Sequence, residues 1–416
     1  MVPAESGSIM HSHTQVLDSR YSWMRLAVSV LIATIGNVGM WSVVVVLPMV
    51  QADFGVDRSA ASMPFTMTMV GFAIGSIAWG RFVDKWGIAR PIIVATSLSG
   101  LGFVLCGVAP SIWLFGLAHG VLIGFGTAIN FAPLLADISH WFLKKRGLAV
   151  AAAATGNYVA GVIWPPLMQP FLAAEGWRWT YVAISIIVVV ATVPLALLLR
   201  RSRPGAGATD ASGAAPALVR SDLSPRTLQA LLIIAGLGCC VAMSMPQVHI
   251  VAYCVDLGHG MARGSEMLSL MLFGGIFSRL LSGWIADRIG GVRTLLIGSI
   301  GQGLALLFYI PFDGLVALYV VSLVFGLSQG GIVPSYAIIV REYMPANEAG
   351  QRVGILVMAT IIGMAIGGWM SGWIYDLTGS YAAAFLNGIA WNLLNLAMIL
   401  IVLWRTRGPR LAAAAA

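Results

Sequence analysis

Long apolar runs, each separated from the next by a short polar turn, make up almost the whole chain. A helix that crosses a bilayer needs about 20 predominantly apolar residues, and each run has about that length. The pattern therefore predicts an all-α integral membrane protein with twelve transmembrane helices. The runs lie at residues 25–48, 59–79, 91–109, 112–136, 147–172, 178–199, 228–253, 265–286, 293–312, 315–340, 352–375 and 382–404.

The composition agrees with this pattern and excludes a soluble protein. Hydrophobic residues make up 59% of the 416 residues, charged residues make up 10%, and the mean hydropathy is +0.88. A soluble domain of this size does not reach such values. The net charge of +8 taken alone would suggest a nucleic-acid partner, but the distribution of the basic residues gives a different explanation.

The basic residues are divided unevenly between the two sides of the predicted membrane. Twenty Lys and Arg residues fall on the side that holds both termini, whereas only Arg58, Arg178 and Arg263 fall on the other side. Because positive residues are retained on the cytoplasmic side, we expect both termini to be cytoplasmic. The same excess favours contact with the anionic heads of membrane lipids, and we expect no nucleic-acid partner.

A stretch rich in Gly, Ala, Ser and Pro separates the sixth and seventh runs. Such a composition predicts a flexible linker, here on the cytoplasmic side, that joins two halves of six helices each. The expected organisation is a cytoplasmic tail at 1–24, a first six-helix bundle at 25–203, the linker at 204–226, a second six-helix bundle at 227–404 and a cytoplasmic tail at 405–416.

The two halves carry the same loop. The sequence Gly-x-x-x-Asp-(Arg/Lys)-x-Gly begins at Gly80 and again at Gly283, 203 residues later, and Gly176 and Gly379 keep the same offset. The glycines permit a sharp turn and close helix packing, and the charged residues can pair at the helix ends. Repeats of this kind place a substrate site near the membrane midplane, between halves that rock about it.

This repeated loop resembles the signature loop of the major facilitator superfamily, and the resemblance covers nearly the whole chain. It implies the twelve-helix major facilitator fold, with two pseudo-symmetric six-helix bundles. It also implies that the loops and nearby acidic residues control the inward/outward equilibrium, with Asp137 as the expected partner of Arg81 and Glu342 in the equivalent place in the second half. The residues assigned to this conformational switch are Gly80, Arg81, Asp84, Lys85, Gly87, Asp137, Gly283, Asp287, Arg288, Gly290 and Glu342.

Arg279 lies deep inside an otherwise uncharged run. It comes eight residues before Asp287, where the following polar turn begins. At a helical rise of 1.5 Å per residue it lies about 12 Å inside the edge of a hydrocarbon layer about 30 Å thick. A guanidinium at this depth costs ~2.5 kcal/mol or more, so it should face a cavity or a partner. We interpret Arg279 as the main functional candidate; the alternative is a structural ion pair between helices.

Three segments, 139–149, 249–258 and 277–283, resemble the bacterial monocarboxylate transporter and oxalate/formate antiporter branches of the same superfamily. The first carries Trp-Phe, three basic residues and Gly-Leu-Ala, and the other two correspond to the seventh and eighth spans. The resemblance implies that Arg279 holds the substrate carboxylate. A guanidinium offers a planar fork that matches a carboxylate, so the chemistry agrees.

We expect Arg279 to be the only buried cation. The oxalate/formate branch uses a second cation in the eleventh span, whereas the run at 352–375 has only Arg352, at its edge. One buried charge suits a monoanion better than a dianion. Moving an anion together with a proton requires a titrating carboxylate, and the resemblance favours Asp256 for this role; the alternative is that Asp256 only ends a helix at the outer surface. Animal members of the branch carry an aspartate at the position of Gly275, so their proton relay does not transfer to this chain.

Further polar residues inside the runs can bind a carboxylate or a hydroxyl group. Each of them can instead form a hydrogen bond between helices. The predicted substrate-binding set is Arg279, His249, Asn130, Tyr158, Asn157, Gln329 and Tyr336.

The resulting hypothesis is a multi-pass secondary transporter of the bacterial inner membrane. It carries a small monocarboxylate, such as lactate or pyruvate, in symport with a proton by alternating access. The alternatives are an organic-anion exchanger, a proton-driven exporter of amphipathic compounds, or a sensor of transporter-like fold, although no large soluble signalling domain is present. We expect a monomer without metal or cofactor, and no enzyme activity, because no nucleophile–base pair, metal cluster or phosphate loop is recognisable.

Overall fold

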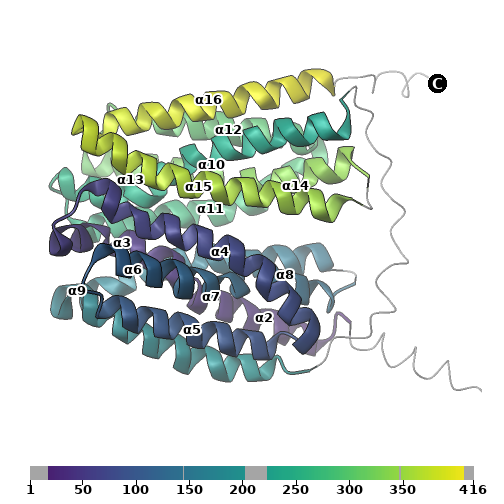
Figure 1. The fold of residues 1–416 in the computed structure, drawn as a ribbon. Coiled ribbons are helices and arrows are strands. Elements are labelled where there is room, and N and C mark those ends of the chain that lie inside the picture. Colours follow the sequence, from purple (N-terminus) through teal and green to yellow (C-terminus); the bar gives the residue numbers. More distant parts are fainter. Residues whose placement is uncertain (1–16, 144, 202–222, 346–347, 407–416) are drawn as a thin grey trace, which may run out of the picture. The chain divides into compact units, whose positions relative to one another are not determined.

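The computed structural model describes residues 17–143, 145–201, 223–345 and 348–406 (Figure 1). Within these ranges all regular structure is helical, as the apolar pattern predicts. Eleven helical segments of the described chain are long and apolar enough to cross a membrane. The protein is therefore a multi-pass membrane protein. Most of the predicted linker, and most of both predicted tails, lie outside the described residues.

Contacts divide the chain into two compact units. The first consists of Met1–Ser42 and Gly71–Ser212, and the second of Val43–Val70 and Gly213–Ala416. The turn between the first two predicted spans, with the helix ends on both sides of it, thus packs with the second half of the sequence.

The first unit is built from helices of very different length. α9 packs against both α2 and α5 (Figure 1). The helices are α2 (Arg20–Gly36), the beginning of α3 (Val38–Phe54), most of α4 (Arg58–Trp86), α5 (Ala89–Gly107), α6 (Ile112–Ala118), η1 (His119–Gly124), α7 (Phe125–Thr127), η2 (Ala128–Asn130), α8 (Ala132–Ser139) and α9 (Arg146–Leu198).

The second unit contains the rest of α3, the start of α4 and all the helices that follow α9. α10 packs against α15 and α16, and α11 packs against α13. The helices are α10 (Pro225–Asp256), α11 (Met261–Ile289), α12 (Gly291–Phe308), α13 (Leu315–Gln329), α14 (Ile332–Tyr343), α15 (Ala349–Thr378) and α16 (Tyr381–Arg405).

Glycines at corresponding positions of the two halves have positive φ values. Gly87 and Gly290, 203 residues apart, have φ values of 72° and 84°, and Gly176 and Gly379 have φ values of 75° and 66°. Residues with a Cβ rarely adopt positive φ, which explains why glycine occupies these turns. Positive φ therefore recurs at the offset of 203 residues seen in the sequence.

Two predicted spans are interrupted at corresponding positions. In the first half the helix breaks at Phe131, which has φ −120° and ψ −99°, and α8 then begins with Ala132 and Pro133. In the second half α13 ends at Gln329, and α14 begins at Ile332 with Pro334 in its first turn. A proline is tolerated at a helix start because the first N–H groups have no partner within the helix.

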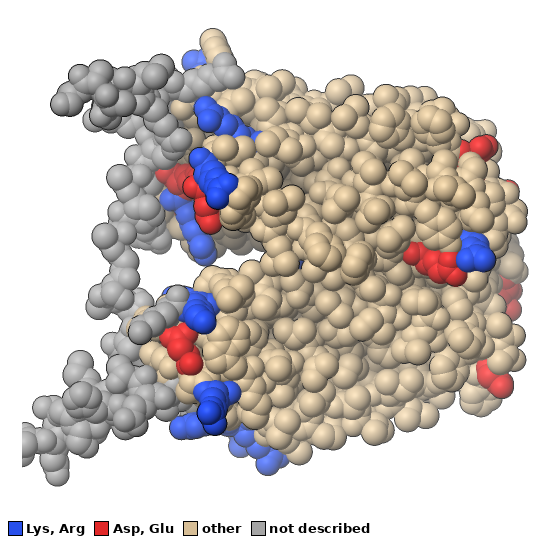
Figure 2. Space-filling view, turned by 180° about the vertical axis from the view of Figure 1, so that it is seen from behind, with Lys and Arg blue, Asp and Glu red and all other residues tan. Residues whose placement is uncertain are grey.

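Charged side chains lie mainly near the helix ends. On the face of the molecule that Figure 2 presents, Lys, Arg, Asp and Glu gather at the ends of the helices, and a broad surface between them belongs to other residue types. Large apolar side chains are exposed away from the helix ends, for example Val190 of α9 and Leu393 of α16, which are 66% and 59% accessible. Such surfaces are expected where helices face lipid tails.

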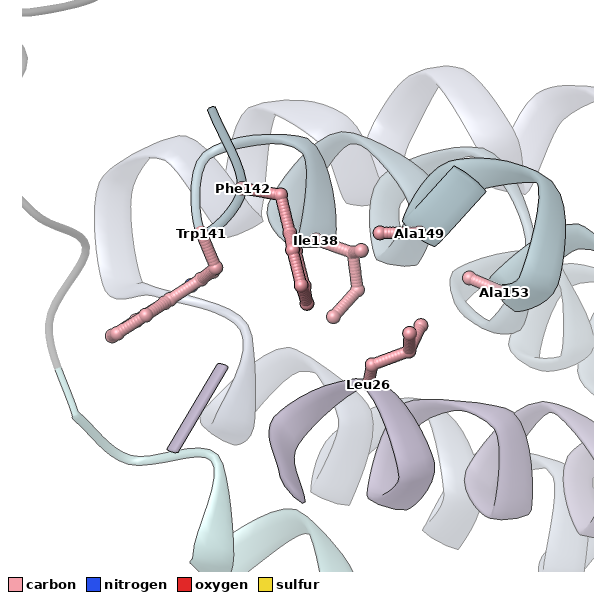
Figure 3. Close-up of a cluster of buried hydrophobic side chains, with 6 residues drawn as sticks. All are labelled: Leu26, Ile138, Trp141, Phe142, Ala149 and Ala153. Carbon is pink, nitrogen blue, oxygen red and sulfur yellow. The ribbon is translucent and has the colours of Figure 1, made fainter. Parts of the chain in front are cut away.

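The segment with the Trp-Phe motif closes one end of the first unit. Trp141 and Phe142 are buried together with Leu26 of α2, Ile138 of α8, and Ala149 and Ala153 of α9 (Figure 3). The Arg25 guanidinium lies over the Trp141 ring, 4.3 Å from its centroid. The motif therefore joins α2, α8 and α9.

Candidate functional site

Arg279 lies in the interior of α11, eighteen residues after Met261 and ten before Ile289. At 1.5 Å per residue, these spacings put it about 27 Å and about 15 Å from the two helix ends. The side chain is partly buried, and its Nε donates a hydrogen bond of 3.4 Å to the carbonyl oxygen of Gly330. Gly330 lies at the break between α13 and α14, so the guanidinium lies beside an interrupted helix.

Glycines allow α11 to approach this break closely. A Cβ added to Gly330 would collide with the carbonyl oxygen of Gly275, and one added to Gly331 would collide with the Ser282 side chain. The small residues therefore let the backbones of α11 and the α13–α14 break come together, as small residues do in membrane helices. This packing positions Arg279.

Gln329 lies directly before Gly330 and pairs with a glutamine that the sequence analysis missed. The Gln247 Nε2 group donates a 2.7 Å hydrogen bond to Gln329 Oε1, and both side chains are buried. Gln247 Oε1 and Gln329 Nε2 are buried without a hydrogen-bond partner among the described residues. The pair thus keeps one carbonyl oxygen and one NH2 group unused, the latter on the residue before Gly330, which Arg279 contacts.

Asp256 and His249 belong to a second group of polar residues, centred on Arg58. The Arg58 guanidinium donates to Asp256 Oδ1 at 3.0 Å and to the Tyr381 hydroxyl at 2.9 Å. His249 is fully buried, with Nδ1 3.0 Å from the same hydroxyl and Nε2 2.7 Å from the Gly368 carbonyl oxygen. These residues form a continuous chain of hydrogen bonds within the second unit.

The backbone at Arg58 is anchored as firmly as its side chain. The Asp376 carboxylate accepts hydrogen bonds from the backbone N–H groups of Arg58 and Ser59, each at 2.8 Å, and so caps the start of α4. Gly372 makes room for this contact, because a Cβ there would lie 2.8 Å from the Arg58 carbonyl oxygen. The Arg58 guanidinium also lies 4.7 Å from the ring centroid of Tyr375. Aspartate and aromatic side chains thus surround it.

The expectation that Arg279 is the only buried cation is wrong. Arg25 is 1% exposed and Arg58 is 6% exposed. Each can be buried because an aspartate and neutral acceptors surround its guanidinium, which offsets the loss of water. Both lie near helix starts, so Arg279 differs from them by its position in the middle of a long apolar helix.

The structure gives Asp137 a partner that the sequence analysis did not consider. Asp137 Oδ2 accepts from Arg25 Nη2 at 2.7 Å and from Arg25 Nε at 3.0 Å, and both side chains are almost fully buried. Arg25 Nη1 donates to the Leu199 carbonyl oxygen at 3.0 Å. This ion pair connects α2, α8 and the end of α9; a pairing of Asp137 with Arg81 stays a prediction.

The two predicted switch loops lie at the surface of their units. Asp84, Lys85, Asp287 and Arg288 are exposed. Both Glu342 carboxylate oxygens accept from the backbone N–H of Gly291 at 3.1 Å, so Glu342 caps the start of α12. Of the other residues in the predicted set, Gly87 and Gly290 lie at the α4–α5 and α11–α12 junctions. Gly80 and Arg81 lie in the last turns of α4, and Gly283 lies in the last turns of α11.

The remaining predicted binding residues lie on three different helical elements, η2, α9 and α14. Asn130 ends η2 at the break of the fourth span, and its amide packs against Gly36. Asn157 and Tyr158 lie in α9, where the Asn157 carbonyl oxygen accepts from Trp41 Nε1 at 3.1 Å. Tyr336 is buried in α14 and donates to Asn395 of α16 at 3.1 Å. Tyr336 thus serves packing between helices in this structure.

Comparison with known proteins extends these observations. The sequence profile of the Major Facilitator Superfamily matches residues 30–315 and 264–416. Monocarboxylate transporter 13 of Bos taurus is 27% identical over 332 residues, which are 78% of this chain and 75% of that protein. Monocarboxylate transporter 11 of Homo sapiens is 31% identical over 316 residues, which are 73% of this chain and 66% of that protein.

The fold is also found among solved structures. A bacterial homologue of the human lysosomal transporter Spinster, in an inward-facing and occupied conformation, superposes with a TM-score of 0.74. The alignment covers 94% of this chain and 98% of that one, at 14% sequence identity. At this identity the similarity shows the fold alone.

Proposed function

The chain belongs to the major facilitator superfamily, and we propose that it carries a small monocarboxylate together with a proton across the bacterial inner membrane. Lactate and pyruvate are the substrates that we expect. The relatives named monocarboxylate transporters support this substrate class, since they align with about three quarters of the chain.

The observation that carries this proposal is the position of Arg279. It is a cation in the middle of α11, beside the break between α13 and α14, and its Nε already reaches a backbone carbonyl. In membrane transporters, interrupted helices near the midplane form the substrate sites. A partly buried guanidinium at such a site can hold a carboxylate through two parallel hydrogen bonds. One such cation suits a substrate with one negative charge.

The Gln247–Gln329 pair supports a substrate that bears a polar group besides its carboxylate. Two amides joined by one hydrogen bond leave one whole NH2 group and one carbonyl oxygen for other partners. Lactate offers a hydroxyl group and pyruvate offers a keto oxygen. Gln329 precedes Gly330 and so lies at the same helix break as the proposed carboxylate site, and Gln247 contacts it from α10.

Asp256 remains our proposed proton site, and the contacts around it indicate how its protonation changes the packing of α4 against α10. The charged and titratable groups near it are Arg58, Asp376, Tyr375, Tyr381 and His249. While Asp256 is ionised, it holds the Arg58 guanidinium at 3.0 Å. Protonation removes the negative charge of Asp256 and weakens the attachment of α4 to α10, because a hydrogen bond to an ionised carboxylate is stronger than one to a neutral carboxyl group.

The length of α9 supports twelve membrane crossings. Its 53 residues would extend about 80 Å, far more than one crossing of about 30 Å. Gly176, with φ 75° and ψ 176°, interrupts it. The residues before and after Gly176 would each be long enough to span the membrane once. Twelve crossings place both termini on one side, and the basic residues favour the cytoplasm for that side.

The two switch loops and two nearby acidic residues are proposed to control the conformational change. We assign the 80–87 and 283–290 loops, with Asp137 and Glu342, to control of the inward/outward equilibrium. Asp137 would act by holding Arg25 and Glu342 by capping α12, and each contact can form in one state of the transporter and break in the other.

Transport by the purified full chain in proteoliposomes tests the proposed function. We expect an inward proton gradient to drive accumulation of labelled lactate or pyruvate, and a protonophore to abolish it. Uptake that depends on an unlabelled anion inside the vesicles, and not on the proton gradient, would show an exchanger instead. Absence of any carboxylate uptake would contradict the proposal.

A further inference from the structure

A cavity of about 770 Å³ lies in the first unit, where α4 ends and α5 begins. Its wall also includes residues that follow α9, and the buried Arg25–Asp137 pair lines it. Arg279 belongs to the other unit, so this cavity is not part of the proposed carboxylate site.

The cavity is strongly basic. Among the residues that the structure describes, five cationic side chains line it and two acidic ones, Asp84 and Asp137. Asp137 neutralises Arg25, whose guanidinium is also held by the Leu199 carbonyl oxygen. The four other cations are exposed: Lys85, Arg90, Arg200 and Arg201. A concave site with an excess of one charge attracts ligands of the opposite charge.

The start of α5 adds to this positive character. Ile88 precedes the helix and makes no side-chain hydrogen bond to the first turn, and both Ile88 and Ala89 line the cavity. The N-terminal end of a helix carries a partial positive charge and has N–H groups without partners in the helix. Arg90 lies in the first turn of α5 and adds a full positive charge at this helix end.

The cavity wall also includes apolar side chains. Val83, Trp86 and Ile93 line it, and Trp86 is 48% exposed. Trp86 stacks on Phe82, which is also exposed, with their ring centroids 5.1 Å apart. Exposed aromatic rings beside cationic side chains are typical of the level of the lipid headgroups. A ligand that combines an anionic head with an apolar body would use both parts of the wall.

We propose that this cavity binds the phosphate group of an anionic phospholipid headgroup. Basic pockets at the cytoplasmic ends of transmembrane helices bind such headgroups. Arg90, Arg200 and Arg201 supply charge for the phosphate, while Trp86 and Ile93 contact the less polar part of the lipid. The cavity also contains Asp84 and Lys85 of the first switch loop, so an occupied site lies directly at that loop.

Native mass spectrometry of the purified full chain tests this site. Phosphatidylglycerol and phosphatidylcholine are added in turn, and the bound lipid is counted. We expect the wild type to retain phosphatidylglycerol in preference to phosphatidylcholine. The double variant Arg90→Gln/Arg200→Gln should bind phosphatidylglycerol roughly thirtyfold more weakly, because each cation near an anionic lipid contributes a factor of about five.

A matched control removes the same charge elsewhere. Arg293 and Arg405 are exposed in the second unit and do not line the cavity. Arg293→Gln/Arg405→Gln should bind phosphatidylglycerol like the wild type, and thermal unfolding checks that both double variants are folded. An equal loss of binding in the two double variants, or no loss in either, would overturn the proposal.

Competition with inorganic phosphate distinguishes a lipid headgroup from free phosphate as the natural ligand of the cavity. If the site is built for a lipid, an excess of free phosphate leaves phosphatidylglycerol bound, because phosphate makes no contact with the apolar wall. Displacement of the lipid by free phosphate at equal concentration would instead assign the site to soluble phosphate and overturn the role of the lipid.

Discussion

The Arg58 guanidinium donates a 3.0 Å hydrogen bond to the Asp256 carboxylate, although 198 residues separate them in the sequence. The Asp256 side chain is 26% exposed and that of Arg58 is 8% exposed, so protons from water can reach the carboxylate while the guanidinium stays nearly buried. This pair is the main support for a proton-responsive contact at the ends of α4 and α10.

Replacing Asp256 by Asn should remove the pH dependence of transport. The amide keeps the size of the side chain but cannot bind a proton in this pH range, so uptake should no longer rise as the outside pH falls. Initial rates of lactate uptake across a pH series measure this. Asp313→Asn is the control, because Asp313 is an exposed aspartate of the same unit, and its pH profile should match the wild type. An unchanged profile for Asp256→Asn would assign the proton to another group.

Replacing Asp376 by Ala should loosen the start of α4. The variant loses the carboxylate that accepts from the N–H groups of Arg58 and Ser59. Loss of such a cap costs about 1 kcal/mol of stability. Thermal unfolding in detergent should show a lower midpoint than for Glu175→Ala, which removes an exposed carboxylate of α9. Equal midpoints for the two variants would show that the cap contributes nothing.

Breaking the Arg25–Asp137 pair should strongly destabilise the protein. Removing one partner leaves an uncompensated buried charge, which costs about 3–5 kcal/mol. We expect Arg25→Met and Asp137→Leu each to lower the unfolding midpoint, and the double variant to lie closer to the wild type than either single variant, since it buries no unpaired charge. If the double variant is as unstable as the two single effects combined, the ion pair is not what stabilises this end of the first unit.

Adding a methyl group at Gly330 should impair transport by displacing α11. The new Cβ of Gly330→Ala would collide with the Gly275 carbonyl oxygen, and overpacking of this kind costs about 1–3 kcal/mol. Because Arg279 Nε contacts Gly330, the shift should weaken substrate binding as well as stability. Gly314→Ala is the control: it precedes α13, and a Cβ there meets no atom within 4 Å. Equal transport by the two variants would contradict the proposed role of the close packing.

The sequence pattern predicted the helices well because hydrophobicity reports directly on membrane crossing. The run at 112–136, for example, corresponds to the helical stretch Ile112–Ser139. The breaks at Phe131 and Gly330 were not foreseen, since both lie within continuous apolar runs and depend on tertiary packing. The repeated glycines, in contrast, were visible in the sequence, because positive φ restricts the choice of residue.

The predicted site residues were harder to group by sequence alone. Arg58 was counted only as a basic residue on the outer side, and nothing local to it indicates Asp256 or Tyr381 as partners. The one feature of the sequence that sets Arg58 apart is that only three basic residues fall on the side opposite the termini. The sequence does not single out Gln247, because a glutamine in an apolar run can bind a substrate or form a hydrogen bond between helices. Its importance follows from the hydrogen bond to Gln329, which only the fold brings about.

Arg279 is proposed to bind the substrate carboxylate. Lactate uptake by the wild type, Arg279→Lys and Arg279→Ala in proteoliposomes under an inward proton gradient tests this role. We expect Arg279→Ala to lose at least about 2 kcal/mol of binding, a decrease in apparent affinity of roughly thirtyfold or more. Arg279→Lys should lie between the two, because it keeps the charge but not the bidentate fork. Folded Arg279→Ala protein that takes up lactate like the wild type would contradict the account.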